Sequence, residues 1–460
     1  PVVAAEIERK GLPSGSVHGR VATRGGEAVA DPVVVALKQG VPYAWAHGRD
    51  GRYELPLPTG RYELYATGKG YSQSTPTEVE VANGARARLD FDTLEPPGRV
   101  QFSVTQAGQD GRPLDARVAI AAGQRPLVEF LGRSTFFTEL ERPGQLETLL
   151  APGRYELVVT SGGVFFGPPA RLQVDVRPGA AERVAVQLER LFHPADSGWH
   201  AADLHHHADQ AEGVTPPADL ARSQLAAGLD LLFVSDHDST ANHATLQALA
   251  TKRGVPFIPS MELSPSWGHF NAWPLEPGMA LAIDTGQATI QQVLAEARRH
   301  GALVVQANHP LIPYGYFASL RAGLVPGGFD PAFDLVEINA DVPFDDATLA
   351  EAWALWNAGH RYYLAGGTDV HDVWNHESGR LRTFARLDGP ATVAAYARAV
   401  KAGAAYVSYG PLIESSVQFG SDLAVAPGTP FTLAFTLRAV PGMAEVKLIE
   451  AGRVVATRRF

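Results

Sequence analysis

The sequence predicts a multidomain protein in which a β/α barrel is flanked by β modules, and three observations lead to this prediction. The chain has 460 residues, more than the roughly 100–200 residues that one compact domain usually holds. Residues 15–190 form short segments of alternating apolar and polar side chains between Gly, Pro, Asn and Asp, a pattern typical of β-strands. From residue 198 to about 410, apolar strands alternate with helical stretches, which indicates parallel βα units.

The composition excludes several classes of protein. Hydrophobic residues make up 45% of the chain and charged residues 19%, which is typical of a globular protein and not of a disordered one. The net charge of −10, without any Lys/Arg tract, argues against nucleic-acid binding, which needs a basic surface. No run of 18 or more apolar residues is present, so the sequence predicts no membrane-spanning helix.

The chain contains no cysteine, which excludes disulfides, thiolate metal sites and a cysteine nucleophile. Any bound metal must therefore be held by nitrogen and oxygen atoms. The sequence begins at Pro1 without a methionine. We take this as a sign that a secretory leader has been removed and expect a periplasmic or secreted protein, although a cytoplasmic location stays open. A precursor with ordinary cytosolic residues at its start would refute this hypothesis.

Two β modules are predicted before the barrel, at residues 1–97 and 98–194. A weak internal repeat supports this division, because the Gly-Arg-Tyr-Glu-Leu of residues 60–64 recurs at residues 153–157. In the first module, the segments 19–21 (Gly-Arg-Val) and 50–53 (Asp-Gly-Arg-Tyr) resemble the carboxypeptidase-regulatory-like domain, a small β-sandwich. The resemblance implies a packing or spacer module, and binding of carbohydrate or a protein partner is the second interpretation.

The barrel is predicted at residues 195–410 and a short C-terminal β module at residues 411–460. Expected barrel strands include residues 231–234, 303–305, 335–336 and 362–364. Expected helices include residues 217–227, 286–300, 345–358 and 390–402. After Gly410 the sequence returns to strand-like alternation, which predicts the last module.

Histidines are concentrated directly after the predicted barrel strands. His205, His237, His309 and His371 each follow an apolar segment, and Asp or Asn stands close to each of them. The carboxyl ends of barrel strands meet on one face of the fold, so these side chains are expected to share one site. A set of His and Asp side chains in one pocket predicts a metal centre.

Residue spacing within these motifs also favours metal binding. His205 and His207 are two positions apart, so an extended segment points both to the same side while His206 points away. Asp369 and His371 repeat this spacing, and Glu262 offers a carboxylate that can bridge two ions. Imidazoles with bridging carboxylates suit Zn, Mn or Fe.

The ordered motifs of residues 198–410 resemble those of the polymerase-and-histidinol-phosphatase (PHP) superfamily, and within it the CehA/McbA-like group that includes the carbaryl hydrolases. The matching motifs are Asp203 to His207, Glu212-Gly213, Gly228 to Asp230, Ser235 to His237, Met261 to Ser264, Gly268 to Asn271, Asn308 to Pro310, Val336 to Asn339 and Gly366 to His371.

This resemblance implies a distorted (β/α)7 barrel that binds two or three divalent ions. The sequence departs from the family at Glu212, where the family usually has Asp, and Asp209 is an alternative carboxylate nearby. The resemblance assigns His205, His207, Glu262 and Asp369 to one ion, Glu262, His269 and His309 to a second, and His237, His371 and Glu212 to a third.

The interpretation that follows is a metal-dependent hydrolase that acts on a small-molecule substrate. A hydroxide bridged by two ions would attack an ester or carbamate bond, with Glu262, Asp369 and His371 nearest to the chemistry. The first alternative is a phosphoesterase acting on a small phosphorylated molecule or nucleotide. The second alternative is a non-catalytic surface or binding protein that the metal stabilises.

Aromatic residues close to the ligand motifs favour the ester or carbamate reading, because they predict an apolar pocket for a neutral substrate. Trp267, Tyr314 and Tyr316 are the expected substrate contacts, and packing in the core is the alternative role for such residues. The segment 310–334, rich in Gly, Pro and aromatic residues, is expected to act as a substrate loop or lid.

Overall fold

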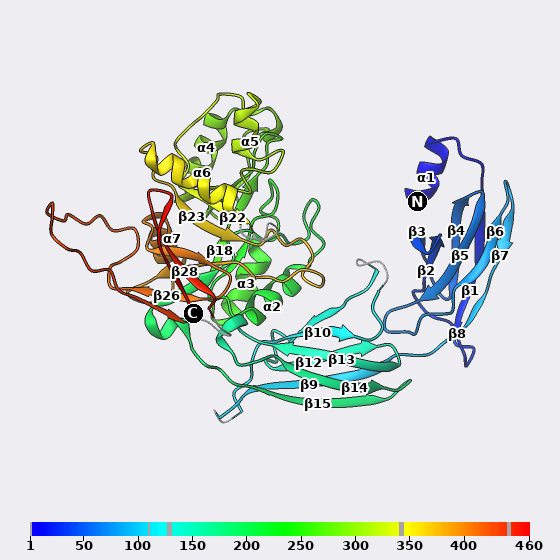
Figure 1. Ribbon diagram of the computed structural model, residues 1–460. Coiled ribbons are helices and arrows are strands. Elements are labelled where there is room, and N and C mark those ends of the chain that lie inside the picture. The colour runs from blue at the N-terminus through cyan, green and yellow to red at the C-terminus, as the bar shows by residue number, and fades with distance from the viewer. Residues whose placement is uncertain (1, 109–110, 127–130, 340–344, 439–442) are drawn as a thin grey trace.

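The computed structural model describes residues 2–108, 111–126, 131–339, 345–438 and 443–460. Figure 1 shows three groups of elements: a first set of strands at the N-terminus, a second set of strands, and an α/β region. The second set of strands lies between the other two groups (Figure 1). No helix in the described ranges has the length and apolar character needed to cross a bilayer.

The first set of strands forms two sheets that enclose one core. One sheet has the order β4-β1-β7, with β8 also paired to β1, and the other has the order β3-β2-β5-β6. Val17 and Leu57 of the first sheet pack against Val34 and Leu64 of the second, and all four side chains are fully buried. The elements are α1 (Val2–Arg9), β1 (Ser14–Thr23), β2 (Val33–Lys38), β3 (Val41–His47), β4 (Arg52–Pro58), β5 (Gly60–Thr67), β6 (Thr77–Val81), β7 (Arg86–Arg88) and β8 (Phe91–Leu94).

The second set of strands also forms two sheets around a core, in the orders β11-β10-β13-β14 and β12-β9-β15. The internal repeat has the same structural role in both sets. The Tyr62 hydroxyl donates to the carbonyl of Pro58 over 3.0 Å, and the Tyr155 hydroxyl donates to that of Ala151 over 2.9 Å. The elements are β9 (Gly98–Gln106), β10 (Arg117–Ala122), β11 (Thr135–Phe137), β12 (Gln145–Leu150), β13 (Gly153–Thr160), η2 (Gly163–Phe165), β14 (Ala170–Val176) and β15 (Ala181–Leu188).

The α/β region contains ten strands and six α-helices among the described residues. Strand β20 is antiparallel to both β19 and β21, whereas β21, β22 and β23 are parallel. The elements are η3 (Pro194–Ser197), β16 (Trp199–Ala202), α2 (Pro217–Ala226), β17 (Leu232–Val234), α3 (His243–Arg253), β18 (Phe257–Pro259), β19 (Met261–Leu263), β20 (Phe270–Trp273), η4 (Thr285–Gln287), α4 (Ile290–Arg299), β21 (Val304–Ala307), α5 (Tyr316–Arg321), β22 (Leu335–Asn339), α6 (Asp346–Asn357), β23 (Tyr363–Gly367), β24 (Arg382–Arg386), α7 (Val393–Lys401) and β25 (Ala405–Ser408).

The predicted multidomain organisation with β-rich N-terminal parts is confirmed. The distorted (β/α)7 barrel stays a prediction, and β20 departs from the expected parallel βα units because it runs antiparallel to β19 and β21. Hydrogen bonds nevertheless join the segment after β16 to strands on both sides. The amide of Asp369 donates to the carbonyl of His205 over 2.8 Å, and that of Ser235 donates to the carbonyl of His206 over 2.8 Å.

The second set of strands is attached to the α/β region by charged and apolar contacts. Arg253 of α3 forms an ion pair with Asp115, with 2.6 Å between Nη2 and Oδ2. Leu140 packs in the same apolar cluster as Leu220 of α2. The contact surface between these two groups also contains a cavity, which is described below.

The C-terminal part forms two separate hairpins. Beyond residue 420, the described residues contribute to none of the hydrophobic clusters of the protein, and most of their side chains are exposed. The strands predicted here are present, whereas the domain bounds at residues 97, 194 and 410 stay predictions. The elements are β26 (Leu412–Ser415), β27 (Phe435–Arg438), β28 (Glu445–Glu450) and β29 (Arg453–Arg459).

Candidate metal centre

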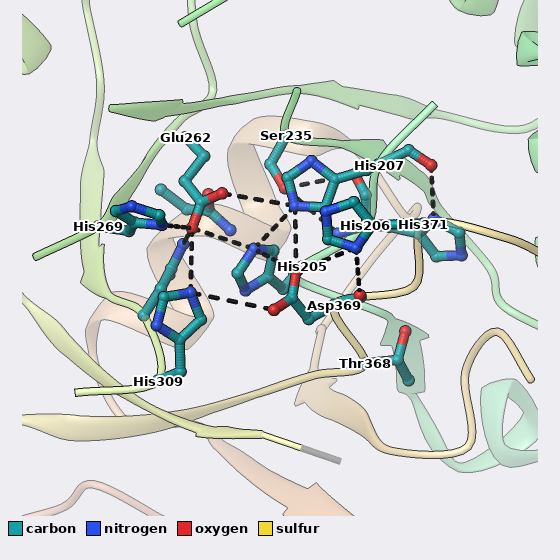
Figure 2. Close-up of polar contacts among 12 residues, drawn as sticks. His205, His206, His207, Ser235, Glu262, His269, His309, Thr368, Asp369 and His371 are labelled. Carbon is teal, nitrogen blue, oxygen red and sulfur yellow. Dashed lines mark hydrogen bonds and ion pairs between the residues drawn. The ribbon is translucent and has the colours of Figure 1, made fainter. Parts of the chain in front are cut away.

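Strand ends of the α/β region bring imidazole and carboxylate groups into one cluster, which we call the metal centre. Figure 2 shows these side chains pointing toward one another from separate segments of the chain. The donor atoms fall into overlapping groups of three, each within 4.8 Å of one another. The members of the metal centre are His205, His207, His237, Glu262, His269, His309, Asp369 and His371, with Glu212 at its edge.

His205 and His207 enter the metal centre from the same side of an extended segment. Their Nε2 atoms are 3.1 Å apart, and both side chains are fully buried. His206, between them, points the other way and places its Nε2 2.8 Å from the Ser378 hydroxyl. This alternation is the one that an extended backbone imposes.

Short distances link the donors of His205, His207, Glu262 and Asp369. His205 Nε2 lies 3.2 Å from Glu262 Oε1 and 3.1 Å from Asp369 Oδ1, and His207 Nε2 lies 3.1 Å from the same Asp369 oxygen. Donors that share one cation at about 2.1 Å are separated by roughly 3 to 3.5 Å, so each of these pairs fits a shared divalent cation. The groups whose donor atoms all lie within 4.8 Å of one another are His205 with His207 and Glu262, and His205 with His309 and Asp369. The assignment of all four residues to one ion therefore stays a prediction.

Glu262 is the side chain that the most histidines share. Its Oε1 lies 3.2 Å from His269 Nδ1 and 3.4 Å from His309 Nε2, the set expected for a second ion. Its Oε2 lies 3.0 Å from His237 Nδ1. The sequence divided these residues among three ions. In the structure, Glu262 contacts members of all three groups, so the donors form one continuous set.

The third expected group lies at the exposed edge of the metal centre. Glu212 Oε1 lies 3.3 Å from His237 Nε2 and 3.2 Å from His371 Nε2, although 69% of the Glu212 side chain is exposed. His207 also belongs to this group. Asp209, the alternative carboxylate, instead accepts a hydrogen bond of 2.9 Å from the Asn242 side chain.

Hydrogen bonds behind the metal centre orient its imidazoles. His205 Nδ1 donates to Glu337 Oε1 over 2.8 Å, and His371 Nδ1 donates to the carbonyl of Asp369 over 2.8 Å. A proton on Nδ1 leaves Nε2 with a free lone pair, the form in which an imidazole binds a metal. His371 Nε2 is buried and makes no hydrogen bond, although Glu212 Oε1 lies 3.2 Å away, so its lone pair fits the role of a metal ligand.

The sequence did not assign Glu337 or Asn308 a role, although both stand in the matched motifs. Glu337 also accepts a hydrogen bond of 2.6 Å from the amide of His309, and the Asn308 side chain donates to Glu262 Oε1 over 2.8 Å. Both side chains are buried. A charged residue in the middle of the apolar strand β22 was the available signal for Glu337, because such a residue needs a buried partner.

Two metal-centre residues have strained backbones. Asp369 has a φ of 54° and His309 a φ of 26°, in the left-handed region that residues other than glycine rarely adopt. Strain of this kind is kept where the surrounding structure enforces it, and it is often found at functional sites. The backbone conformation therefore agrees with a functional role for both residues.

Opposing effects set the pKa values at the centre of the cluster. Burial lowers the pKa of His205, but the negative charges of Asp369, Glu337 and Glu262 outweigh burial and hold this pKa well above its usual value. Burial raises the pKa of Glu262 and Asp369, but the positive charge of His205 outweighs it and holds both carboxyl pKa values well below their usual range. Both carboxylates are therefore ionised and able to bind a cation.

The pKa values of two other imidazoles, His207 and His237, are shifted in opposite directions. Burial lowers the pKa of His207 to about 3, so this side chain is neutral and already in the ligand form. Burial also acts on His237, but the hydrogen bond to Glu262 outweighs it and raises the pKa of His237 to about 8. A proton on His237 must leave before this residue can bind a metal at neutral pH.

The three aromatic residues predicted to contact substrate have different environments. Trp267 and Tyr316 lie in the hydrophobic core with almost no exposed surface, and Tyr316 donates to Gly328 and accepts a hydrogen bond from the Asp330 amide. Packing therefore replaces substrate contact as their role, because neither ring has a free face. Tyr314 is 51% exposed, and its ring centre lies 5.6 Å from that of His269. Burial and the carboxylates of the metal centre raise its pKa, so the hydroxyl stays protonated.

Comparison with known proteins adds family information at two places in the chain. Residues 16–95 match the carboxypeptidase regulatory-like domain, which confirms the resemblance of the first β module. Over 113 residues the chain is 32% identical to the 3′,5′-nucleoside bisphosphate phosphatase of Chromobacterium violaceum, a stretch that covers 23% of this chain and 39% of that protein. Over 65 residues it is 32% identical to a 5′-3′ exoribonuclease of Haemophilus influenzae, covering 14% and 24%. The chain thus spans less than half the length of these curated relatives.

Solved structures with related segments have low overall similarity. A two-domain protein from Bacteroides vulgatus, described as containing a PHP-like metal-dependent phosphoesterase, has a TM-score of 0.37 and 17% identity, over 48% of this chain and 73% of that chain. An amidohydrolase from Chromobacterium violaceum has a TM-score of 0.27 and 18% identity, over 37% of this chain and 87% of that chain. The narrower resemblance to the CehA/McbA-like group has no support among these proteins and stays a prediction.

Proposed function

We propose that the protein is a metal-dependent hydrolase of the PHP type, and that it cleaves the phosphate ester of a small phosphorylated molecule. The proposal includes two or three divalent cations at the metal centre. It also includes the distorted barrel and the four-part domain division expected from the sequence. The sequence motifs alone favoured an ester or carbamate substrate, but the charge of the donor set and the curated relatives favour a phosphate ester.

The observation that carries the proposal is the charge of the donor set. Six of its members are imidazoles, and only Glu262, Asp369 and the exposed Glu212 are carboxylates. Two divalent cations would balance the four negative charges of Glu262, Asp369, Glu212 and the Glu337 behind His205, and a third would leave two positive charges in excess, because imidazoles bind metals in the neutral form. A site with excess positive charge favours an anionic substrate such as a phosphate ester over a neutral ester.

The arginines near the motifs do not supply the positive charge that would bind a phosphate. Arg298, Arg299 and Arg321 form ion pairs with Asp334, Glu296 and Glu351. The cations would therefore balance the charge of the phosphate themselves. The partial identity to a nucleoside bisphosphate phosphatase and to an exoribonuclease supports the same choice, and the ester or carbamate reading becomes the second candidate.

Each residue of the metal centre has a distinct role in this proposal. His205, His207, Glu262 and Asp369 would hold one cation, and Glu262 with His269 and His309 would hold another. Bound cations of this kind activate water and polarise the phosphoryl oxygen. Glu337 fixes the ring of His205 and the backbone of His309 through its two oxygens, so it positions two ligands from behind.

The exposed edge of the metal centre is where the substrate would enter. His371 and Glu212 lie at this edge, and the ring centre of Tyr314 lies 5.6 Å from that of His269 and 5.9 Å from that of His309. A protonated hydroxyl at this position can donate a hydrogen bond to a phosphoryl or leaving-group oxygen. His371 donates from Nδ1 to its own chain, so only Nε2 is available for a cation or a substrate.

An assay of the metal-loaded protein with four substrates tests the proposal. We expect turnover of p-nitrophenyl phosphate and of a 3′,5′-nucleoside bisphosphate, and little turnover of p-nitrophenyl acetate or 1-naphthyl N-methylcarbamate. The His205→Ala variant and a chelated sample serve as controls for contaminating phosphatases. Turnover of only the acetate or carbamate would restore the first sequence interpretation. No turnover at full metal occupancy would favour the non-catalytic alternative.

A further inference from the structure

A cavity of about 450 Å³ lies between the second set of strands and the α/β region, away from the metal centre. Its walls come from β13, from the loop after β13 and from the segment 376–382. A volume of this size can hold a small organic molecule. We call it the arginine cavity, because Arg117, Arg380 and Arg382 all line it.

Arg382 is the most unusual of these arginines, because it is buried with only 5% of its surface exposed. Its guanidinium donates to the carbonyls of Gly379 and Ala227, which uses only part of its donors. Among the described residues, no carboxylate lies within 4.0 Å of the Arg382 guanidinium, the distance limit for an ion pair. Burial lowers the pKa of Arg382, and the more distant charges of Asp203, Asp230 and Glu377 oppose that shift.

A buried guanidinium without an adjacent carboxylate is energetically costly, because removing a charge from water must be offset by a counter-charge. Capping the end of α2 through Ala227 accounts for some of its contacts but supplies no negative charge. The local chemistry therefore leaves room for an anion beside Arg382.

Arg117 adds a second positive charge to the same cavity. Its Nε is buried and makes no hydrogen bond, and its side chain is 24% exposed. The one carboxylate near it is Glu377, whose Oε1 lies 3.9 Å from Arg117 Nη1, among the described residues. Glu377 is 52% exposed, so this pair is long and largely screened by solvent.

The rest of the cavity wall is mostly apolar. Phe137, Val159, Phe166 and Leu188 line it, and each is buried in the protein. Apolar walls around a small number of charged groups are typical of sites for amphipathic ligands. An inorganic anion alone would leave these walls without a partner.

We propose that the arginine cavity is a binding site for a small organic anion, with the acidic group at Arg382 and Arg117 and an apolar body against the phenylalanine side of the cavity. The ligand class is a carboxylate with an apolar body, such as a medium-chain fatty acid. The site is separate from the metal centre, and its ligand needs no bound cation and no hydrolytic activity.

Calorimetric titration of the chelator-treated full chain with octanoate tests this proposal, with octanol and inorganic phosphate as matched probes; removal of the cations keeps phosphate from binding at the metal centre. We expect saturable binding of one octanoate per chain and at least about tenfold weaker binding of both octanol and phosphate. Equal binding of octanoate and octanol would overturn the role of the arginines. Equal binding of octanoate and phosphate would overturn the role of the apolar walls, and no saturable binding of octanoate would overturn the site itself.

Charge variants with opposite expected effects separate binding from general stability. Arg117→Gln should weaken octanoate binding by about tenfold, whereas Glu377→Gln should strengthen it several-fold by removing a competing carboxylate. Arg154→Gln is the matched control, because Arg154 lies on β13, a strand that lines the cavity, but is itself exposed and pairs with Asp175. Octanoate binding that changes in the same direction in Arg117→Gln and Glu377→Gln, or stays unchanged in both, would contradict the proposal.

Arg382→Gln should abolish octanoate binding, and its melting temperature must be measured first. A folded Arg382→Gln protein that binds octanoate as tightly as the natural sequence would contradict the proposal. If this variant does not fold, the Arg117 and Glu377 variants decide the question, because both side chains are partly exposed and are tolerant of substitution.

Discussion

One short segment, residues 203–207, supplies two residues of the metal centre and contacts a wall residue of the arginine cavity. His205 and His207 point into the metal centre, while His206 points to Ser378, which lines the arginine cavity. One site gathers lone pairs of imidazoles and carboxylates, and the other gathers guanidinium donors. The first is suited to cations and the second to anions.

This difference shows how each site satisfies its buried charges. In the metal centre, the charges of Glu262 and Asp369 are balanced by protons on His205 and His237, which a divalent cation can replace. In the arginine cavity, Arg382 cannot lose its proton, so only a ligand can supply a close counter-charge. The two sites should therefore respond to opposite perturbations.

The largest expected effect is the loss of the metal centre in the His205→Ala variant. His205 contacts Glu262, Asp369, His207 and Glu337, so its removal should lower metal occupancy and reduce phosphate hydrolysis by at least about a thousandfold. Metal analysis, kinetics and circular dichroism measure these effects. His193→Ala is the control, because His193 pairs only with Asp196 in the linker. Full activity of the His205→Ala variant would show that the metal centre does not carry out the hydrolysis.

The next effect is the pH dependence of metal binding. His237 has a pKa raised to about 8, so below that pH a cation must displace its proton, and the apparent metal affinity should fall by about tenfold per pH unit for each proton displaced. Glu262 and Asp369 stay ionised over this range because their pKa values are held low. Titration of the chelator-treated protein with Mn²⁺ between pH 6 and pH 9 measures the slope. A constant affinity between pH 6 and pH 8 would contradict the pKa of His237.

A smaller effect on catalysis is expected from the exposed Tyr314, and none from the buried Tyr316. Tyr314→Phe removes a hydroxyl beside the metal centre and should lower kcat/KM by about tenfold with unchanged metal content. Tyr316→Phe removes a buried hydroxyl that accepts from the Asp330 amide, so it should cost about 1 kcal/mol of unfolding free energy without changing catalysis. Equal kinetics for Tyr314→Phe and the natural sequence would remove Tyr314 from the substrate site.

The smallest effect concerns the link between the two sites. His206 Nε2 lies 2.8 Å from the Ser378 hydroxyl, the Ser378 hydroxyl lies 2.8 Å from that of Ser223, and Ser223 donates to the carbonyl of Leu220. Ser378→Ala leaves the buried His206 Nε2 without its partner and should cost about 1–3 kcal/mol of unfolding free energy. Metal affinity should change by less than about tenfold, because His206 does not face the metal centre. A complete loss of metal in this variant would show that His206 controls the orientation of both neighbouring ligands.

The metal centre could be predicted from the sequence because its ligands stand in short local motifs. His205 and His207 alternate along one strand end, and Glu262, His309 and Asp369 each follow an apolar strand. The grouping of donors around individual ions could not be anticipated. It depends on side-chain rotamers, which join His207 to His237 and His371 as well as to Glu262.

The arginine cavity was not predictable in this way. Arg117 and Arg382 stand in different β-rich and α/β parts of the chain, and neither belongs to a motif. Only the packing of the second set of strands against α2 brings them to one cavity. Parallel βα units were likewise expected from hydrophobic periodicity, which does not reveal strand direction, so the antiparallel β20 was missed.

The most direct test of the central claim is anomalous X-ray diffraction from crystals of the Zn- or Mn-loaded protein. We expect at least two cation peaks enclosed by His205, Glu262, His309 and Asp369, with Glu262 in contact with both. Cations found only on the protein surface, or a metal centre that stays without anomalous density at saturating metal, would contradict the account.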